Sequence, residues 1–281
     1  MTKADLQPLA RKAEALRRLH HGPHAVVFPN AWDVTSARIV EAAGFPAIAT
    51  TSAGIANLFG YPDSQIISRD EMLSMVARIA AAVSVPVSAD MEAGYADTAL
   101  QMYDTAEEII RAGAVGLNLE DSLNDESRLV DLDLELEKIK AVRQASEDTG
   151  VPLVLNARTD AYWWKGAQPA TRMKETIRRA NAFREAGADC IFIPGLKDLD
   201  EIRLFLRESP GPLNILAFPG VPSIAELEEA GVRRVSIGSG GYRTAMGLMR
   251  RLVEQIKTGG SYDLISEYAI PFPEVNALLR K

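Results

Sequence analysis

The sequence predicts a single (β/α)8 barrel of the TIM type, and two observations carry this prediction. Eight strand-sized apolar runs alternate with helical patterns along the chain, as expected for βα units around a parallel sheet. The approaches to these runs also alternate, between an Ala-Gly pair and a proline. A closed barrel stacks inward side chains from odd and even strands in separate layers, so a two-strand period repeated four times favours closure. An open doubly wound sheet is the alternative.

The elements follow in order along the chain. Residues 1–24 are expected to form an N-terminal helix, residues 25–257 the barrel and residues 258–281 a C-terminal arm. Ala-Gly pairs precede the even runs because glycine supplies the left-handed residue that ends a helix, whereas proline suits a strand entrance. The eight predicted strands are AVVFPN (25–30), AIATTS (47–52), VPVSAD (85–90), GLNLED (116–121), LVLNAR (153–158), CIFIPG (190–195), NILAFPG (214–220) and RVSIGSG (234–240).

Composition and charge narrow the class of function. A net charge of −7 and a pI near 5.2 disfavour a nucleic acid or an anionic membrane as partner, since both require a basic surface. No apolar run reaches the length of a membrane span, and the N-terminal stretch reads as a charged amphipathic helix, so we expect a cytoplasmic protein. The single cysteine rules out an intrachain disulfide and any metal site built from several cysteines.

Histidine and cysteine lie at the wrong ends of the predicted strands for catalysis. Active sites of such barrels form at the C-terminal ends of the strands, whereas the N-terminal ends mainly serve stability. His20, His21 and His24 all precede the first strand, and Cys190 opens the sixth. We therefore expect neither imidazole nor thiolate chemistry, and we expect Cys190 to be buried and structural.

Acidic residues follow the strand exits instead. Asp90 ends the third run, Glu92 follows two residues later, and Glu120 lies at the end of the fourth run beside Asp121. Carboxylates gathered beside an apolar core repel one another unless a cation holds them ionised, and oxygen ligands of this kind suit Mg²⁺ or Mn²⁺. The sequence therefore predicts a metal site made by these three residues. The alternative for Asp90 or Glu92 is that the carboxylate caps the following helix.

An arginine and a segment of small residues complete the predicted site at the strand exits. Arg158 ends the fifth run, and its planar guanidinium suits two-point contact with a carboxylate. It is alternatively a structural partner of Asp160. Thr51 and Ser52 end the second run and Ala53 follows it. Small residues here let backbone N–H groups approach an anion, or they form only a turn.

These motifs together resemble the isocitrate lyase and phosphoenolpyruvate mutase superfamily over roughly residues 25–250. The resemblance rests on Phe28-Pro29-Asn30-Ala31-Trp32-Asp33, the Thr50–Gly54 segment, Gly60-Tyr61-Pro62-Asp63, Asp90-Met91-Glu92-Ala93-Gly94-Tyr95, Leu119-Glu120-Asp121 and Asn156-Ala157-Arg158-Thr159-Asp160. It implies a barrel that binds Mg²⁺ and a 2-oxo acid or its enolate.

The resemblance also implies roles for single residues. Asp90 looks like the direct metal ligand, with Glu92 and Glu120 acting through metal-bound water. Arg158 and the Thr51-Ser52 backbone look like the clamp on substrate, and Asp63 looks like a supporting acid. The segment 261–281 is similar to the C-terminal helix that family members exchange between subunits, so a homodimer or homotetramer is expected.

The sequence departs from the family in the loop that starts at Asp121. Family lyases carry a Lys-x-Cys-Gly-His segment here and mutases carry a Glu-Asp-Lys start, whereas this chain has neither cysteine nor histidine in the loop and Ser122 stands at the lysine position. We therefore expect a Mg²⁺-dependent lyase that cleaves or decarboxylates an oxaloacetate-like 2-oxo acid. The alternatives are a 2-oxo acid binding protein with little turnover and a mutase-like or 2-methylisocitrate lyase-like activity. The glycine-rich turn 238–241 adds a weak phosphate-binding signal.

Overall fold

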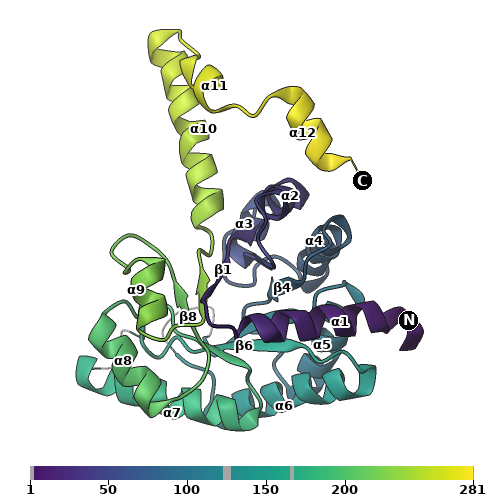
Figure 1. Cartoon of the computed structure of the whole chain (residues 1–281), viewed down its shortest axis with the longest axis vertical. Coiled ribbons are helices and arrows are strands. Elements are labelled where there is room, and N and C mark those ends of the chain that lie inside the picture. Colours follow the sequence, from purple (N-terminus) through teal and green to yellow (C-terminus); the bar gives the residue numbers. More distant parts are fainter. Residues whose placement is uncertain (1–2, 123–127, 165–167, 281) are drawn as a thin grey trace.

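The computed structural model describes residues 3–122, 128–164 and 168–280, and it shows helices packed around a parallel β-barrel (Figure 1). All of the strands run in the same direction and each is hydrogen-bonded to its neighbours. The strands are β1 (Val26–Phe28), β2 (Asn30–Ala31), β3 (Ile48–Thr50), β4 (Val87–Asp90), β5 (Gly116–Glu120), β6 (Val154–Arg158), β7 (Cys190–Phe192), β8 (Leu213–Leu216) and β9 (Arg234–Ser236).

The sheet closes through its first strand. β1 and β2 are the two halves of this strand, interrupted at Pro29, which has no N–H to give to a ladder. β1 pairs with β9 and β2 pairs with β3, so the order of strands returns to its start. The predicted (β/α)8 barrel is confirmed, and every strand lies in or overlaps one of the eight predicted runs.

The helices alternate with the strands and surround the barrel. Gly44, Gly113, Gly187 and Gly231 have φ values of 84°, 89°, 116° and 102°, as expected for glycines that end helices before the even strands. The helices are α1 (Lys3–Leu19), α2 (Val34–Ala42), α3 (Ser52–Leu58), α4 (Arg69–Ala82), α5 (Ala99–Arg111), α6 (Leu132–Thr149), α7 (Pro169–Ala186), α8 (Leu199–Glu208), α9 (Ile224–Glu229), α10 (Gly240–Gly259), α11 (Asp263–Tyr268) and α12 (Phe272–Leu279).

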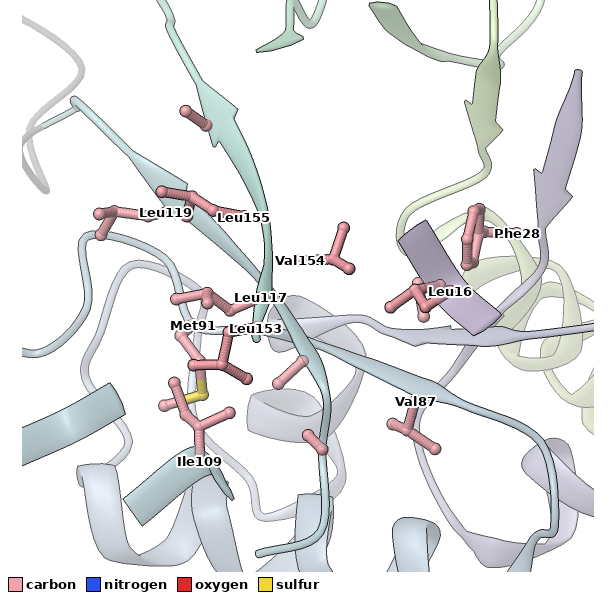
Figure 2. Close-up of a cluster of buried hydrophobic side chains, with 14 of the residues drawn as sticks. Leu16, Phe28, Val87, Met91, Ile109, Leu117, Leu119, Leu153, Val154 and Leu155 are labelled. Carbon is pink, nitrogen blue, oxygen red and sulfur yellow. The ribbon is translucent and has the colours of Figure 1, made fainter. Parts of the chain in front are cut away.

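The core fills the space between strands and helices with aliphatic side chains. Figure 2 shows part of this cluster, in which β5 and β6 contribute Leu117 and Leu155 and α5 contributes Ile109. Helix α1 adds Leu16, whose Cδ2 atom approaches Gly116 so closely that an added Cβ would lie 2.8 Å away. Helix α1 therefore closes the N-terminal end of the barrel, called the floor below, and leaves the opposite end, the mouth, for chemistry.

The C-terminal helices differ from the rest of the chain. Helix α10 projects away from the barrel, and after α11 the chain turns back so that α12 lies against α2 (Figure 1). None of the residues of these three helices is buried, although many are large and apolar. In the described part of the chain, no helix combines the length and the apolar character that a membrane span requires.

Candidate active site

The strands bring the predicted acidic and basic residues to one rim of the barrel. Asp90, Glu120 and Arg158 are the last residues of β4, β5 and β6. The parallel register places Glu120 beside Arg158 and Asp90 beside Asn118, two residues earlier on β5. These side chains therefore meet at the mouth, because the carboxyl ends of parallel strands share one edge.

Asp90 is held by a set of donors that fix its carboxylate. Ser52 donates to Oδ2 from its backbone N at 2.9 Å and from its Oγ at 3.0 Å. Asn118 Nδ2 donates to Oδ1 at 3.2 Å, and the Asp90 backbone N donates to Thr50 Oγ1 at 2.8 Å. The carboxylate orientation is therefore set by β3, α3 and β5 together.

Glu92 carries the most strongly perturbed carboxyl group of the mouth. Its backbone is left-handed, with φ of 51°, directly after β4. The Gln65 backbone N donates to Oε2 at 2.8 Å, whereas Oε1 is buried without a partner. Burial, followed by the charges of Glu120, Asp63 and Asp90, raises the pKa of Glu92 to about 9.

Arg158 joins two acids across the mouth. Its Nε and Nη2 donate to the two carboxylate oxygens of Asp160 at 2.7 Å and 2.8 Å, and its Nη1 lies 2.5 Å from Glu120 Oε2. Ser122 Oγ donates to the other oxygen of Glu120 at 2.9 Å. Burial lowers the pKa of Arg158, but the adjacent Glu120 and Asp160 outweigh this effect and raise it. The pairing of Arg158 with Asp160, left open by the sequence, is present.

The guanidinium keeps donors beyond these contacts. A guanidinium has five N–H groups, of which Asp160 accepts two and Glu120 one. Among the described residues, no acceptor takes the second N–H of Nη1 or of Nη2, the two nitrogens that can contact both oxygens of a carboxylate. Trp163 and Phe192 lie beside the group, with each ring centroid 5.8 Å from Arg158 Cζ.

The remaining predicted site residues differ in what their groups contact. Thr51 caps α3 by accepting from Gly54 N at 3.4 Å, and its own N donates to Ala31 O at 3.0 Å. Ser52 N is bonded to the Asp90 carboxylate, so a bound anion has to replace that contact. Ala53 follows in the first turn of α3. Asp63 acts on the mouth through its charge, which raises the pKa of Glu92.

The three acids are neighbours without forming a closed cluster. Within residues 3–122, 128–164 and 168–280, no three histidine, cysteine, aspartate or glutamate side chains are grouped so as to hold a metal ion. Asp90 nevertheless offers oxygen ligands, and Glu92 has one buried oxygen with no donor. Such a donor set fits an oxygen-loving divalent cation that keeps several waters.

The structure adds residues that the sequence analysis did not assign. Asn118 accepts from Asn156 Nδ2 at 2.7 Å and from Arg234 Nη2 at 3.3 Å, which orients its amide toward Asp90. Arg234 is fully buried, and its strand position could have been recognised because alternate residues of a barrel strand point inward. Asp121 is also buried, and it pairs with Arg179 of α7 at 3.1 Å.

The structure also places the histidine and the cysteine that were expected at the N-terminal ends of the strands. His20 and Cys190 are buried at the floor, far along the strands from the acidic rim.

The turn before α10 lines a cavity of about 890 Å³ with Arg243 and Arg250. Its backbone N–H groups at Ile237 and Gly238 donate to Asn30 Oδ1 at 2.9 Å and 2.8 Å, so these two donors are already used. Residues 123–127 of the loop that starts at Asp121 lie outside the described residues.

Comparison with known proteins places the chain in a family. The family model described as phosphoenolpyruvate phosphomutase matches residues 16–257. The chain belongs to this family. It is thus a member of the isocitrate lyase/PEP mutase superfamily, as the motifs predicted, and the expectation of an enzyme is confirmed because superfamily members are carbon–carbon lyases and mutases.

Three proteins similar to this chain illustrate the activities found among its relatives. The crystal structure of a candidate lyase/mutase from Burkholderia cenocepacia J2315 is 36% identical, with a TM-score of 0.90, and the match covers 96% of this chain and 97% of that chain. The oxaloacetate decarboxylase of Rhodopseudomonas palustris is 31% identical over 81% of this chain and 78% of its own length. The 2-methylisocitrate lyase of Bacillus subtilis is 30% identical over 89% and 83%.

Proposed function

We propose that this chain is a Mg²⁺- or Mn²⁺-dependent lyase that cleaves or decarboxylates a small 2-oxo acid of the oxaloacetate type through an enolate. The observation that carries the proposal is the Arg158 guanidinium at the acidic rim, whose second N–H on Nη1 and on Nη2 has no acceptor among the described residues. A 2-oxo acid offers a carboxylate that fits these two N–H groups, and the oxaloacetate decarboxylase among the relatives acts on such a compound.

The acids of the mouth are suited to hold the cation. We assign Asp90 as direct ligand and Glu92 and Glu120 as ligands through water, which agrees with the buried, partnerless Glu92 Oε1. A bound divalent cation would supply positive charge near the substrate oxygens and keep the neighbouring carboxyl groups ionised. The Ser52 and Asn118 donors fix the orientation of Asp90.

The side chains of this chain stabilise the negative charge that develops on the substrate during the reaction. Loss of CO₂ from an oxaloacetate-like molecule leaves the electron pair of the broken C–C bond on the adjacent carbon, where it delocalises onto the 2-oxo oxygen. Arg158 holds the carboxylate that stays on the product, and its positive charge stabilises the enolate. A proton taken from water by the carbon that lost CO₂ then gives the 2-oxo acid product. Trp163 and Phe192 flank the guanidinium and reduce its exposure to water, which strengthens this attraction.

The test is the release of pyruvate from oxaloacetate by purified protein with Mg²⁺, measured against a protein-free Mg²⁺ blank. We expect Arg158→Met and Asp90→Ala each to lower kcat/KM by about 100-fold or more. Arg178→Met is the matched control, because Arg178 is an exposed arginine of α7 that pairs with Glu175. Turnover that is unchanged in Asp90→Ala and Arg158→Met contradicts the proposal.

A second candidate is favoured by the family match and the 2-methylisocitrate lyase relatives: cleavage of a 2-methylisocitrate-like substrate or rearrangement of phosphoenolpyruvate. The same preparation decides between them. Pyruvate released from 2-methylisocitrate favours the lyase alternative, and a phosphonate signal from phosphoenolpyruvate in ³¹P NMR favours the mutase. Thermal stabilisation by oxalate without any product favours a binding protein.

We also propose that two copies of the chain associate through the C-terminal helices. Met249, Val253 and Ile256 of α10 are 54%, 50% and 48% exposed, and Phe272 of α12 is 80% exposed. Large apolar side chains exposed in this number are typical of an interface between subunits. Light scattering after gel filtration should show an oligomer that Val253→Asp dissociates, and a monomeric wild-type protein would contradict this arrangement.

A further inference from the structure

A buried ion pair lies behind the rim. Asp121 follows β5 and is completely buried, and Arg179 in the middle of α7 is 6% exposed. Arg179 Nη1 lies 3.1 Å from Asp121 Oδ2. Two further donors reach the carboxylate, since Thr159 Oγ1 donates to Oδ2 at 2.7 Å and Asp160 N donates to Oδ1 at 2.9 Å. The charge of Asp121 is therefore compensated and its orientation is fixed.

The pair is connected to the substrate clamp by consecutive contacts. Asp121 holds the backbone N of Asp160, and the side chain of Asp160 accepts from two nitrogens of Arg158. A shift of Asp121 therefore moves the acceptor that sets the plane of the Arg158 guanidinium. Arg179 is the cation that keeps Asp121 in place, although it is not among the residues that line the rim.

The same arginine holds the loop that follows β5. Arg179 Nη1 also donates to Val130 O at 3.0 Å, and Val130 N donates to Asp121 O at 2.7 Å. An antiparallel bridge joins Ser122 and Leu129 just beyond this point. One guanidinium thus ties together the loop after β5 and the loop after β6. Its Nε donates to Glu175 on its own helix at 2.9 Å, which anchors it to α7.

We propose that Arg179 is a positioning residue for recognition of the substrate carboxylate, acting through Asp121 and Asp160 on Arg158. This inference rests on the proposed function, because it assumes that Arg158 binds the carboxylate. The competing explanation is that the pair only stabilises the fold, as many buried ion pairs do without affecting a site. The two explanations differ in what happens to ligand affinity in protein that remains folded.

The experiment measures the binding of oxalate and of Mn²⁺ separately. Oxalate affinity is determined by calorimetry in the presence of Mg²⁺, and Mn²⁺ affinity is determined by electron paramagnetic resonance without oxalate. We expect Arg179→Met to weaken oxalate binding about tenfold or more, because the loss of the contacts that hold Asp121 lets the Arg158 guanidinium leave the plane in which two of its N–H groups meet a carboxylate. We expect Mn²⁺ affinity to change less than threefold, since Asp90 is held by other residues. Arg178→Met should leave both affinities unchanged.

A conservative variant keeps the test decisive where Arg179→Met does not fold. Arg179→Lys retains the charge, but a single ammonium cannot hold Asp121, Val130 O and Glu175 with the geometry of a fork. We expect it to fold and to weaken oxalate binding at least threefold. Oxalate affinity equal to wild type in Arg179→Lys and in folded Arg179→Met overturns the proposal.

A double-mutant cycle separates this inference from the proposed function. If Arg179 acts through Arg158, then Arg179→Met has little further effect on oxalate affinity in an Arg158→Met background, whereas independent effects add. Additive losses overturn the positioning role and leave the function of Arg158 intact. An Arg158→Met protein with wild-type oxalate affinity refutes the proposed function itself.

Discussion

The two ends of the barrel bury charged side chains in different ways. At the mouth, Asp90, Glu92 and Glu120 are crowded together, and burial and mutual repulsion raise the pKa of Glu92 to about 9. At the floor, Arg234 is buried against Phe28 and three hydrogen-bond partners, and His20 is held between Leu16 O and Arg234. Glu92 Oε1 at the mouth and Arg234 Nε at the floor are both buried without a partner among the described residues. The two ends differ in charge: the mouth concentrates carboxylates that a cation can neutralise, whereas the floor holds one arginine among the neutral partners His20, Ser88 and Asn118.

The largest expected effect tests the floor as a stability element. Phe28 is fully buried, with its ring 4.3 Å from Arg234 Cζ and 5.9 Å from the His20 ring. We expect Phe28→Ala to lower the free energy of unfolding by about 3–5 kcal/mol, from lost burial and the cavity left behind. Urea denaturation followed by circular dichroism measures this loss.

The matched control is Phe59→Ala, because Phe59 is 42% exposed. Its expected loss is about 0.5 kcal/mol or less. Oxalate affinity of Phe28→Ala, measured where the variant is folded, should stay near wild type. Equal losses for the two phenylalanines, or a selective loss of oxalate binding, would erase the distinction between floor and mouth.

The fold was largely readable from the sequence, for a physical reason. The proline and Ala-Gly signals act over a few residues, and each is satisfied locally: Gly187, for example, takes the left-handed conformation that ends α7. The strand exits also follow from local order, so Asp90, Glu120 and Arg158 were expected at one rim. The interruption of the first strand at Pro29 was not expected, although proline lacks the N–H that a ladder needs.

The residues that hold the site residues in place could not be predicted from the local sequence. Arg179 is 58 residues from Asp121 in the chain and lies in the middle of a helix rich in arginine, where nothing local separates it from Arg178. Only the packing of α7 against the loop after β5 shows that one of these neighbours is buried and the other exposed. The roles of Asn118 and Arg234 depend likewise on which strand faces which.

An intermediate effect is expected from pH at the floor. His20 Nδ1 faces a carbonyl and must donate, whereas Nε2 faces the Arg234 donor and must accept, so the ring is neutral. Burial, then Arg234, lowers the pKa of His20 to about 4, against the opposing charge of Asp189. A lowered pKa contributes stability that is complete above the unfolded value of 6.5 and lost as the pH falls toward 4.

The measurement compares the unfolding free energies of wild type and His20→Gln at pH 7.5 and pH 5. We expect wild type to lose about 2 kcal/mol more than His20→Gln between these values, because each pKa unit corresponds to about 1.4 kcal/mol. His24→Gln should behave like wild type, since the His24 side chain is 81% exposed. A pH dependence identical in all three proteins would show that His20 is not held neutral.

The smallest expected effect on stability concerns the mouth, and it is the most informative about the clamp. Gly195 has φ of 85°, and an added Cβ would overlap the Trp163 indole, which lies beside Arg158. Gly220 has φ of 91° and its nearest neighbour, Lys197 Nζ, is 3.9 Å from the added atom. Alanine at either position should cost about 1–2 kcal/mol for the left-handed backbone. Only Gly195→Ala also displaces Trp163.

The difference between these two variants therefore isolates the aromatic cover of the guanidinium. We expect Gly195→Ala to shift the tryptophan emission and to weaken oxalate binding, because water then reaches the Arg158 fork and screens its charge. Gly220→Ala should change neither property while losing similar stability in urea. Matching oxalate affinities in the two variants would mean that Trp163 contributes nothing to binding, and that Arg158 retains its strength through Glu120 and Asp160 alone.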